Sequence, residues 1–319
     1  MPLNSADYPE EQPQVSILPA AAQANRASIR GSSAQRFLFA ITSLLLVGGI
    51  TAAIVVFWAQ GGRWFIVETP SMGEAMPVGT LVVTTPVAVT SLSVGDIITF
   101  HPPSEPSRIY SHRITRIDPN AVVHTRGDIN GAEDPWGLQE TNIIGRATAV
   151  LPGWGWLVRA LPYLVIGFIL VWLLVSWLFP RTWRAPALFI GFPLVVSVTA
   201  VIIRPFVGVT VLTTTTTDGL PTTTIVSTGL LPIRAKINTA GSTSVDLVSG
   251  QVGSITTSTP SAESFYHLNT IVNLSPWEWG IALLVCASPL VWCLIAGLAS
   301  AKVGSARGAL SHNNKRRLA

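Results

Sequence analysis

The sequence predicts a membrane protein of α plus β class. Transmembrane helices anchor a small, mostly antiparallel β domain and a second exported, β-rich domain. Of the 319 residues, 49% are hydrophobic and 11% are charged, and the mean hydropathy is +0.49. Such values are typical of a chain that is partly surrounded by lipid. Short runs rich in Val, Ile and Thr lie between the apolar segments and indicate β-strands.

Four apolar runs predict transmembrane helices. Each lacks charged residues and has close to the roughly 20 residues that a helix needs to cross the hydrocarbon of a bilayer. Tryptophans lie at or near most of their ends, as is typical of a membrane interface. The first run follows a long N-terminal leader, so we expect a retained anchor rather than a removable signal. The runs are residues 37–59, 161–179, 185–203 and 279–298.

The distribution of basic residues predicts the orientation in the membrane. Segments 1–36, 180–184 and 299–319 hold ten of the 20 Lys and Arg residues but only three of the 16 acidic residues. Because basic loops are retained in the cytoplasm, we expect these segments there, in a multi-pass protein of the plasma membrane. The sequence pI of 9.4 then reflects topology, and no nucleic-acid partner is expected.

These patterns divide the chain into eight parts. The N-terminal tail is rich in Ala, Ser, Pro and Gln, a composition that predicts disorder, and the C-terminal tail is basic. Two parts between the spans are expected on the exported side. The predicted parts are a disordered cytoplasmic tail (1–36), a first span (37–59), an exported β domain (60–159), a second span (160–179), a third span (185–203), an exported Thr/Ser-rich domain (204–278), a fourth span (279–298) and a cytoplasmic tail (299–319).

The first exported domain contains short runs enriched in Val, Ile and Thr that are separated by Pro, Gly, Asp and Asn. Such spacing favours a small, mostly antiparallel barrel or sandwich. The run at 96–100 is apolar on both faces, so we expect it at the centre of the sheet. The predicted strands are 80–85, 96–100, 110–117, 121–125 and 143–150.

The second exported region is rich in Thr and Ser and has only five charged residues between positions 207 and 275. A small β-sandwich is the favoured fold, and a glycosylated or wall-spanning stalk is the rival. It contains no catalytic constellation. We expect it to position substrates, a partner or the first exported domain.

Ser71 and His112 are candidates for nucleophilic catalysis. A serine hydroxyl is a weak nucleophile at neutral pH, and histidine is the side chain that best supplies a general base there. A carboxylate that fixes the imidazole tautomer helps such a base, and Asp134 and Asp128 are the two candidates. The oxyanion of the tetrahedral intermediate needs donors, for which the backbone N–H of Ser71 and the hydroxyl of Thr69 are candidates.

Five short motifs occur in order within the first exported domain. They comprise a serine box, a Gly-Asp strand box, a histidine box, a Gly-Asp-x-Asn box with a second Asp downstream, and a Gly-Arg-Ala box. In this combination the chain, over roughly residues 37–165, resembles a type I signal peptidase of the endoplasmic-reticulum and archaeal kind, which uses Ser and His. The motifs are Ser71-Met72 with Met76-Pro77, Gly95-Asp96-Ile97-Ile98-Thr99-Phe100, His112-Arg113-Ile114, Gly127-Asp128-Ile129-Asn130 with Asp134, and Gly145-Arg146-Ala147.

The resemblance implies a serine endopeptidase that removes N-terminal signal peptides from exported preproteins, with small residues at positions −3 and −1 of the cleavage site. It favours Asp134 as the residue that orients His112, and Asp128 as a second candidate that holds the loop or shares this work. It implies no cofactor and no metal. The implied partners are preprotein signal peptides, the lipid bilayer and the secretion translocon. We expect a bacterial, Gram-positive member, because the chain lacks an endoplasmic-reticulum retrieval signal and has a Thr-rich exported domain.

The chain departs from this family in two respects. Gly73-Glu74-Ala75 stand between the serine box and Met76-Pro77, which lengthens the loop at the nucleophile, and Pro70 stands where Gly is frequent. The C-terminal half is also additional. These departures leave two alternatives open: a peptidase dedicated to a few surface or fibre proteins, or a non-enzymatic surface assembly protein that retains the fold.

The other histidines of the exported regions are expected to be surface or interface residues. These are His101, His124 and His267, and the sequence offers His124 no acidic partner. No His-x-x-x-His spacing occurs, so no zinc site is predicted.

Overall fold

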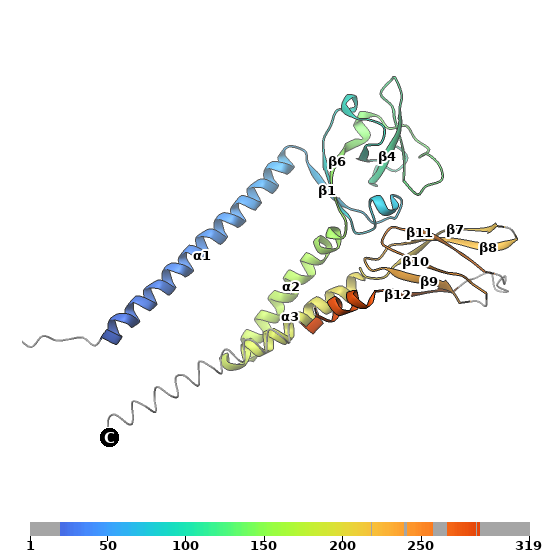
Figure 1. The fold of residues 1–319 in the computed structure, drawn as a ribbon. Coiled ribbons are helices and arrows are strands. Elements are labelled where there is room, and N and C mark those ends of the chain that lie inside the picture. The colour runs from blue at the N-terminus through green and yellow to red at the C-terminus, as the bar shows by residue number, and fades with distance from the viewer. Residues whose placement is uncertain (1–19, 218, 239–240, 258–266, 285, 288–319) are drawn as a thin grey trace, which may run out of the picture. The chain divides into compact units, whose positions relative to one another are not determined.

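A computed structural model of the protein describes residues 20–217, 219–238, 241–257, 267–284 and 286–287. The chain forms two compact units, Met1–Gln60 and Gly61–Ala319. Within the first unit the described residues form one helix. The second unit contains a β domain, a helical hairpin and a further β domain (Figure 1).

Helix α1 (Ala20–Ala59) is 40 residues long, and its part Phe37–Ala59 is long and apolar enough to cross a membrane. The helix begins well before the predicted span, so residues 20–36 differ from the expected disordered tail. The Ala-rich start has high helix propensity, and extending an existing helix requires no new nucleation. Residues 1–19 of the predicted tail lie outside the described residues.

Helices α2 (Trp154–Leu178) and α3 (Arg181–Ile203) pack against each other as a hairpin, and both are long and apolar enough to span a membrane. Phe168 and Phe192 meet edge to face with their ring centroids 5.0 Å apart. At the turn, the Arg184 guanidinium donates 2.7 Å and 3.1 Å hydrogen bonds to the carbonyls of Ser176 and Phe179. A cation there accepts no bond but donates to the last carbonyls of α2, and it interacts favourably with the negative end of the helix dipole.

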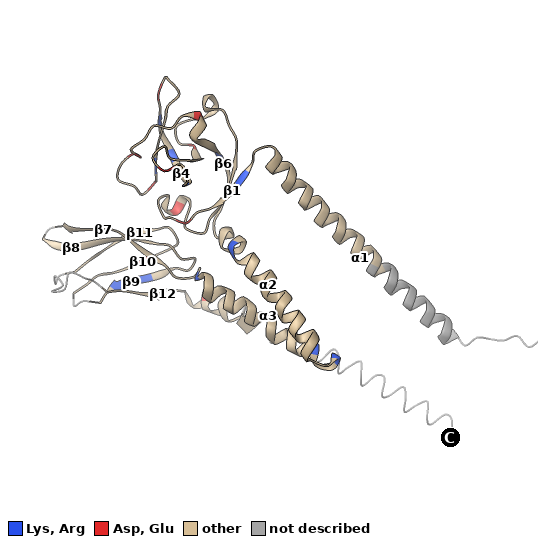
Figure 2. Ribbon diagram, turned by 180° about the vertical axis from the view of Figure 1, so that it is seen from behind, with Lys and Arg blue, Asp and Glu red and all other residues tan. Residues whose placement is uncertain are grey.

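Among the described residues, three helices could therefore cross a membrane, which is consistent with a membrane-anchored α plus β protein. In Figure 2 the Lys and Arg residues of α2 and α3 lie near the helix ends, and the lengths between them are uncharged. Residues 276–284 are helical, as the predicted fourth span requires at its start. Most of that span, 288–298, and the tail 299–319 lie outside the described residues.

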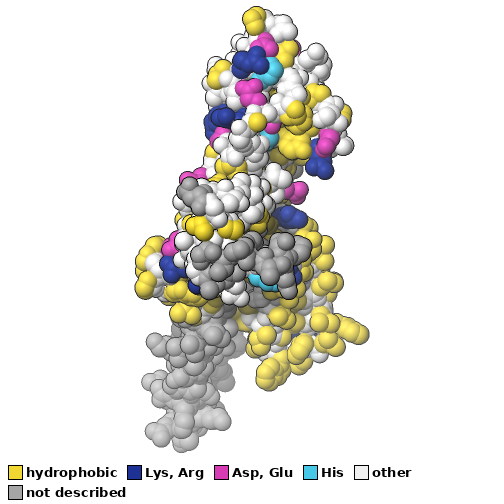
Figure 3. Space-filling model, turned by 90° about the vertical axis from the view of Figure 1, so that its right-hand side faces the viewer, with side chains coloured by type: hydrophobic (Ala, Val, Ile, Leu, Met, Phe, Trp, Pro, Cys, Tyr) yellow, Lys and Arg dark blue, Asp and Glu magenta, His cyan; other side chains and the backbone are white. Residues whose placement is uncertain are grey.

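The first β domain is one six-stranded sheet with the order β1-β2-β6-β3-β4-β5, in which every neighbouring pair is antiparallel. Three short 3₁₀ helices connect the strands. Basic, acidic and histidine side chains are mixed over this domain, at the top of the view in Figure 3. The elements are β1 (Arg63–Ile66), η1 (Gly73–Ala75), β2 (Leu81–Thr85), η2 (Val89–Ser91), β3 (Ile97–Phe100), β4 (Tyr110–Ile117), β5 (Val123–Arg126), η3 (Glu140–Asn142) and β6 (Ile143–Leu151).

The core of this domain lies around strand β3, which pairs with both β6 and β4. Ile98, Thr99 and Phe100 are all buried, so both faces of the strand are covered, as its two apolar registers predicted. A second, smaller cluster of Met72, Met76 and Val82 lies under the segment that follows β1. The active-site candidates are thus attached to a well-packed sheet.

The second β domain consists of two three-stranded antiparallel sheets, ordered β11-β8-β7 and β10-β9-β12. Apolar side chains of both sheets meet in one core, for example Ile225 and Ile255 from one sheet and Ile233 and Leu247 from the other. A shared core between two sheets is the arrangement of a small β-sandwich, the fold that the sequence favoured over a stalk. The strands are β7 (Val209–Thr217), β8 (Leu220–Ser227), β9 (Ile233–Ile237), β10 (Ser244–Leu247), β11 (Val252–Thr256) and β12 (Leu268–Val272).

We predict that Gly145→Ala strongly destabilises the first β domain. A Cβ atom at Gly145 would lie 2.3 Å from the carbonyl oxygen of Thr85, and backbone cannot move aside as a side chain can. Overpacking of this kind costs about 1–3 kcal/mol. Gly131→Ala is the control, because nothing lies within 4 Å of its added Cβ. Thermal unfolding of the detergent-solubilised protein measures both, and equal midpoints for the two variants would contradict the packing described.

Candidate active site

Ser71 lies at the start of a tight turn that is anchored by two buried methionines. Met72 and Met76 are both fully buried, and the three residues between them form the 3₁₀ turn η1. The N–H of Gly73 donates a 2.8 Å hydrogen bond to the carbonyl of Pro70, which closes the turn around the serine. The three-residue insertion therefore forms ordered structure beside the nucleophile candidate and not an open loop.

His112 lies on β4, where it pairs in register with Ile98 of the central strand. Its residue surface is only 4% exposed. The imidazole packs edge to face on Phe100, with ring centroids 6.0 Å apart, and against Tyr110, with centroids 5.7 Å apart. Tyr110 in turn contacts Trp136. Aromatic rings on two sides fix the plane of the imidazole before any substrate is present.

The structure brings Ser71, His112 and Asp134 into one hydrogen-bonded chain. Oγ of Ser71 lies 3.0 Å from Nε2 of His112, and Nδ1 of His112 lies 2.7 Å from Oδ2 of Asp134. An ionised carboxylate can only accept, so Nδ1 carries the proton and donates it to Asp134. Nε2 is then free to accept the hydrogen of the Ser71 hydroxyl. This is the arrangement of a nucleophile, a general base and an orienting acid.

Asp134 is held in place by strand β5. Thr125 Oγ1 donates a 2.6 Å hydrogen bond to Oδ2 of Asp134, and the backbone N–H of Asp134 donates a 2.8 Å bond to the carbonyl of Thr125. The side chains of His112 and Asp134 are only 5% and 7% exposed. The carboxylate is thus fixed by two contacts to one residue and has little access to water.

Asp128 has a different role from Asp134 in this structure. Its carboxylate accepts two hydrogen bonds from Arg113, at 2.9 Å from Nε and 2.7 Å from Nη2. A third guanidinium nitrogen, Nη1, donates a 3.0 Å bond to the carbonyl of Gly95. The hydrogen bonds to Asp128 raise the pKa of the Arg113 guanidinium above its ordinary value. Asp128 therefore fastens the 127–130 loop to the sheet, and the position beside His112 is filled by Asp134.

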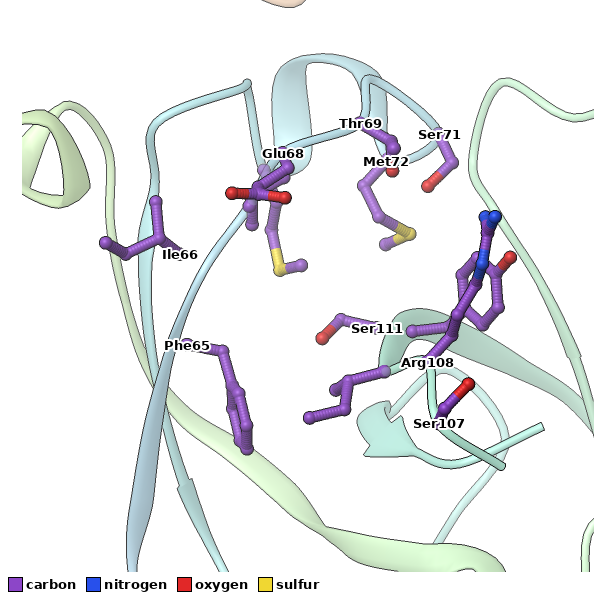
Figure 4. A pocket seen from close by; sticks show the side chains of 13 residues that line it. Phe65, Ile66, Glu68, Thr69, Ser71, Met72, Ser107, Arg108 and Ser111 are labelled. Carbon is purple, nitrogen blue, oxygen red and sulfur yellow. The ribbon is translucent and has the colours of Figure 1, made fainter. Parts of the chain in front are cut away.

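A pocket of about 460 Å³ opens next to Ser71 (Figure 4). Thr69 and Ser71 lie close together at one end of it, and the charged groups of Glu68 and Arg108 also line it. The pocket thus combines apolar walls with the hydroxyl of the nucleophile candidate. Its lining residues come from two segments, 65–76 around β1 and η1 and 107–111 leading into β4: Phe65, Ile66, Val67, Glu68, Thr69, Ser71, Met72, Met76, Ser107, Arg108, Ile109, Tyr110 and Ser111.

His124 departs from the expectation, because it does have an acidic partner. Its Nε2 lies 3.0 Å from Oδ2 of Asp118, which also accepts a hydrogen bond from Arg116. The sequence pattern missed this pair because Asp118 reaches back across the turn between β4 and β5. No serine completes this pair into a second triad in the described residues. His101 contacts the carbonyl of Arg108 through Nδ1 at 3.0 Å.

Sequence reasoning missed three residues that support the site. Thr125 contacts Asp134 directly, Arg113 holds Asp128, and Tyr110 packs on the imidazole. Arg113 is adjacent to His112 in the chain, and Tyr110 precedes it by two residues. Because side chains two apart on a strand share a face, alternation along β4 was a usable signal for Tyr110. The Thr125 contact joins β5 to the segment that folds back on it nine residues later, and no pattern in the sequence indicates it.

In comparisons with known proteins, no family model, no curated protein and no solved structure matches this chain. The chemistry of the site is accordingly carried by its own geometry.

Proposed function

We propose that the protein is a membrane-bound serine endopeptidase of the type I signal peptidase kind, which cleaves N-terminal signal peptides from exported preproteins. The observation that carries the proposal is the chain Ser71, His112 and Asp134, joined at 3.0 Å and 2.7 Å beside an open pocket. The five motifs of the sequence support the same assignment. The three helices that are long and apolar enough to cross a membrane support this proposal, because signal peptides are found at the bilayer.

In the proposed reaction, Oγ of Ser71 attacks the carbonyl carbon of the scissile peptide bond. The hydroxyl proton passes to Nε2 of His112, and Asp134 stabilises the imidazolium that forms. Collapse of the tetrahedral intermediate breaks the C–N bond, and the imidazolium gives its proton to the leaving amine, which is the new N-terminus of the mature protein. A water molecule, deprotonated by His112, then hydrolyses the acyl-enzyme and releases the signal peptide.

The oxyanion of this intermediate requires hydrogen-bond donors close to Ser71. Pro70 has no N–H, so the nearest donors on the same segment are the backbone N–H of Ser71 and the hydroxyl of Thr69. Thr69 lies beside Ser71 at the pocket (Figure 4). We assign these two groups to the oxyanion site. A single preorganised donor of this kind is worth roughly 10²- to 10³-fold in rate in other hydrolases.

We propose that an extended substrate binds beside β1, the terminal strand of the sheet order. Residues of β1 and of the segment that follows it line the pocket next to Ser71. A peptide added there as a strand presents alternate side chains to the pocket. Phe65, Met72 and Met76 give that pocket apolar walls, and the resemblance to signal peptidases implies small side chains at positions −1 and −3 of the cleavage site.

The remaining parts of the proposal concern the membrane. The signal peptide stays in lipid while water reaches the acyl-enzyme, so the active site must lie outside the hydrocarbon but close to it. The position of Ser71 in the sequence, a short segment after the end of α1, suits this requirement. We assign the protein to the plasma membrane with both β domains on the exported side, in contact with the bilayer and the secretion translocon. The additional second β domain is the feature on which the alternative of a peptidase dedicated to a few surface or fibre proteins rests.

Cleavage of a labelled preprotein by the purified protein tests the function. Ser71→Ala and His112→Ala remove the nucleophile and the base and are expected to lower kcat by roughly 10³-fold or more. Asp134→Asn keeps the shape but removes the negative charge that fixes the tautomer of His112 and stabilises its imidazolium, so kcat should fall by roughly 10³- to 10⁴-fold. Asp128→Asn is the matched control and should lose far less, because Asp128 contacts Arg113 and not the imidazole.

Four results test the mechanism and decide between the alternatives. Retained cleavage by Ser71→Ala would exclude the serine mechanism. A larger loss for Asp128→Asn than for Asp134→Asn would contradict the assignment of the two acids. Cleavage of only a few surface preproteins would favour the dedicated peptidase, and an inert parent protein would favour the non-enzymatic assembly role.

The orientation has its own test. An epitope inserted at Gly241, in the turn region between β9 and β10, should be accessible from outside intact cells, because the second β domain is assigned to the exported side. An epitope in the turn between α2 and α3, which carries Arg181 and Arg184, should be accessible only after permeabilisation. Protection of the Gly241 epitope in intact cells would contradict the proposed topology.

A further inference from the structure

The turn between β10 and β11 of the second β domain contacts the turn that carries Ser71. A Cβ atom placed on Gly250 would lie 2.5 Å from the carbonyl oxygen of Gly73 and 2.9 Å from Cα of Glu74. Such distances mean that the backbones of the two domains are in direct contact, with no room for a side chain. Gly73 and Glu74 belong to η1, the insertion that directly follows the serine box.

The same insertion is in contact with the 127–130 loop on another side. A Cβ atom on Gly73 would lie 2.6 Å from Cγ2 of Ile129. The backbone N–H of Ile129 donates a 3.1 Å hydrogen bond to the carbonyl of Ser71, and a Cβ on Gly127 would lie 2.7 Å from the same carbonyl. The turn that carries Ser71 is therefore enclosed between the 127–130 loop and the second domain.

The contact from the second domain is a rigid one. The N–H of Gly250 donates a 2.9 Å hydrogen bond to the carbonyl of Ser227 in β8, and the N–H of Val248 donates a 3.0 Å bond to the side chain of Gln251. The turn is thus bonded both within itself and to the sheet behind it. A second approach between the domains lies near the start of α2, where a Cβ on Gly153 would be 3.2 Å from Leu230.

We propose that the turn at Gly250 is a positioning element for the nucleophile. Its backbone contact with Gly73 and Glu74 holds η1 against the 127–130 loop. This keeps Oγ of Ser71 within hydrogen-bond distance of His112. This inference rests on the proposed peptidase function. It gives the second β domain a defined role, because η1, the three-residue insertion at the nucleophile, needs contacts beyond those of its own domain to stay in place. Misplacement of a reacting group by about 1 Å can lower a rate roughly 100-fold.

Two alanine variants separate the contact from backbone strain. Gly250→Ala and Gly219→Ala both place an alanine at positive φ, at +80° and +75°, in turns of the same domain. Only the Cβ at 250 meets the catalytic domain, since nothing lies within 4 Å of the Cβ at 219. We expect kcat for preprotein cleavage to fall about ten-fold or more in Gly250→Ala with KM little changed, and to stay within about two-fold in Gly219→Ala.

A cross-link tests the contact without relying on activity. In a chain with Cys286→Ser and Cys293→Ser, which removes both native cysteines, the pair Glu74→Cys and Ser249→Cys leaves Gly250 in place and should be joined by a short bismaleimide cross-linker, detected by mass spectrometry. The pair Glu74→Cys and Gly219→Cys should not. This result also decides the matter if Gly250→Ala fails to fold.

The outcomes distinguish the inference from the function on which it rests. If the parent protein cleaves preproteins but Gly250→Ala matches Gly219→Ala, the positioning role is wrong and the peptidase stands. Absence of the 74–249 cross-link under conditions that preserve cleavage would overturn the contact itself. If the parent protein cleaves nothing while the cross-link forms, the contact stands and the function fails.

Discussion

The buried hydrogen bond between His112 and Asp134 is the interaction on which the rest of the site depends. It joins β4 to the segment after β5 at 2.7 Å, in a region where both side chains are almost fully removed from water. A hydrogen bond to a carboxylate is stronger than one between two neutral groups. Removing either partner would leave a buried polar group unpaired, which destabilises the folded protein. It sets the tautomer of the imidazole and thereby turns Nε2 toward Ser71. The sheet register, the Thr125 bond and the aromatic contacts all serve to keep this one pair in place.

The proposed nucleophile, Ser71, is positioned by further contacts. Two buried methionines fix the ends of the η1 turn, while Arg113 and Asp128 fix the loop that bonds to the Ser71 carbonyl. Because Arg113 is next to His112 on β4, one strand supports both sides of the 3.0 Å contact between Nε2 and Oγ. The second β domain contacts the first at this turn, where Gly250 approaches Gly73.

Local sequence patterns predicted the membrane-length helices and strands such as β4 because hydropathy and alternation are properties of neighbouring residues. The helix before Phe37 was missed, since composition predicted disorder where an existing helix simply continues. Ser71 and His112 were predicted from chemistry and motif spacing. The choice between Asp128 and Asp134 was not available to composition or chemistry alone, because it depends on how the segment after β5 folds back, which bonds Asp134 to Thr125 and Asp128 to Arg113. The approach of Gly250 to Gly73 joins residues far apart in the chain, and no local signal exists for it.

The most direct test of the central claim is the chemical reactivity of Ser71. The detergent-solubilised protein is incubated with a fluorophosphonate, and the modified residue is identified by mass spectrometry. The account predicts one adduct within the first β domain, on Ser71, and its loss in His112→Ala, because the hydroxyl is activated through Nε2. An adduct on another serine, or labelling of Ser71 that is undiminished in His112→Ala, would contradict the account.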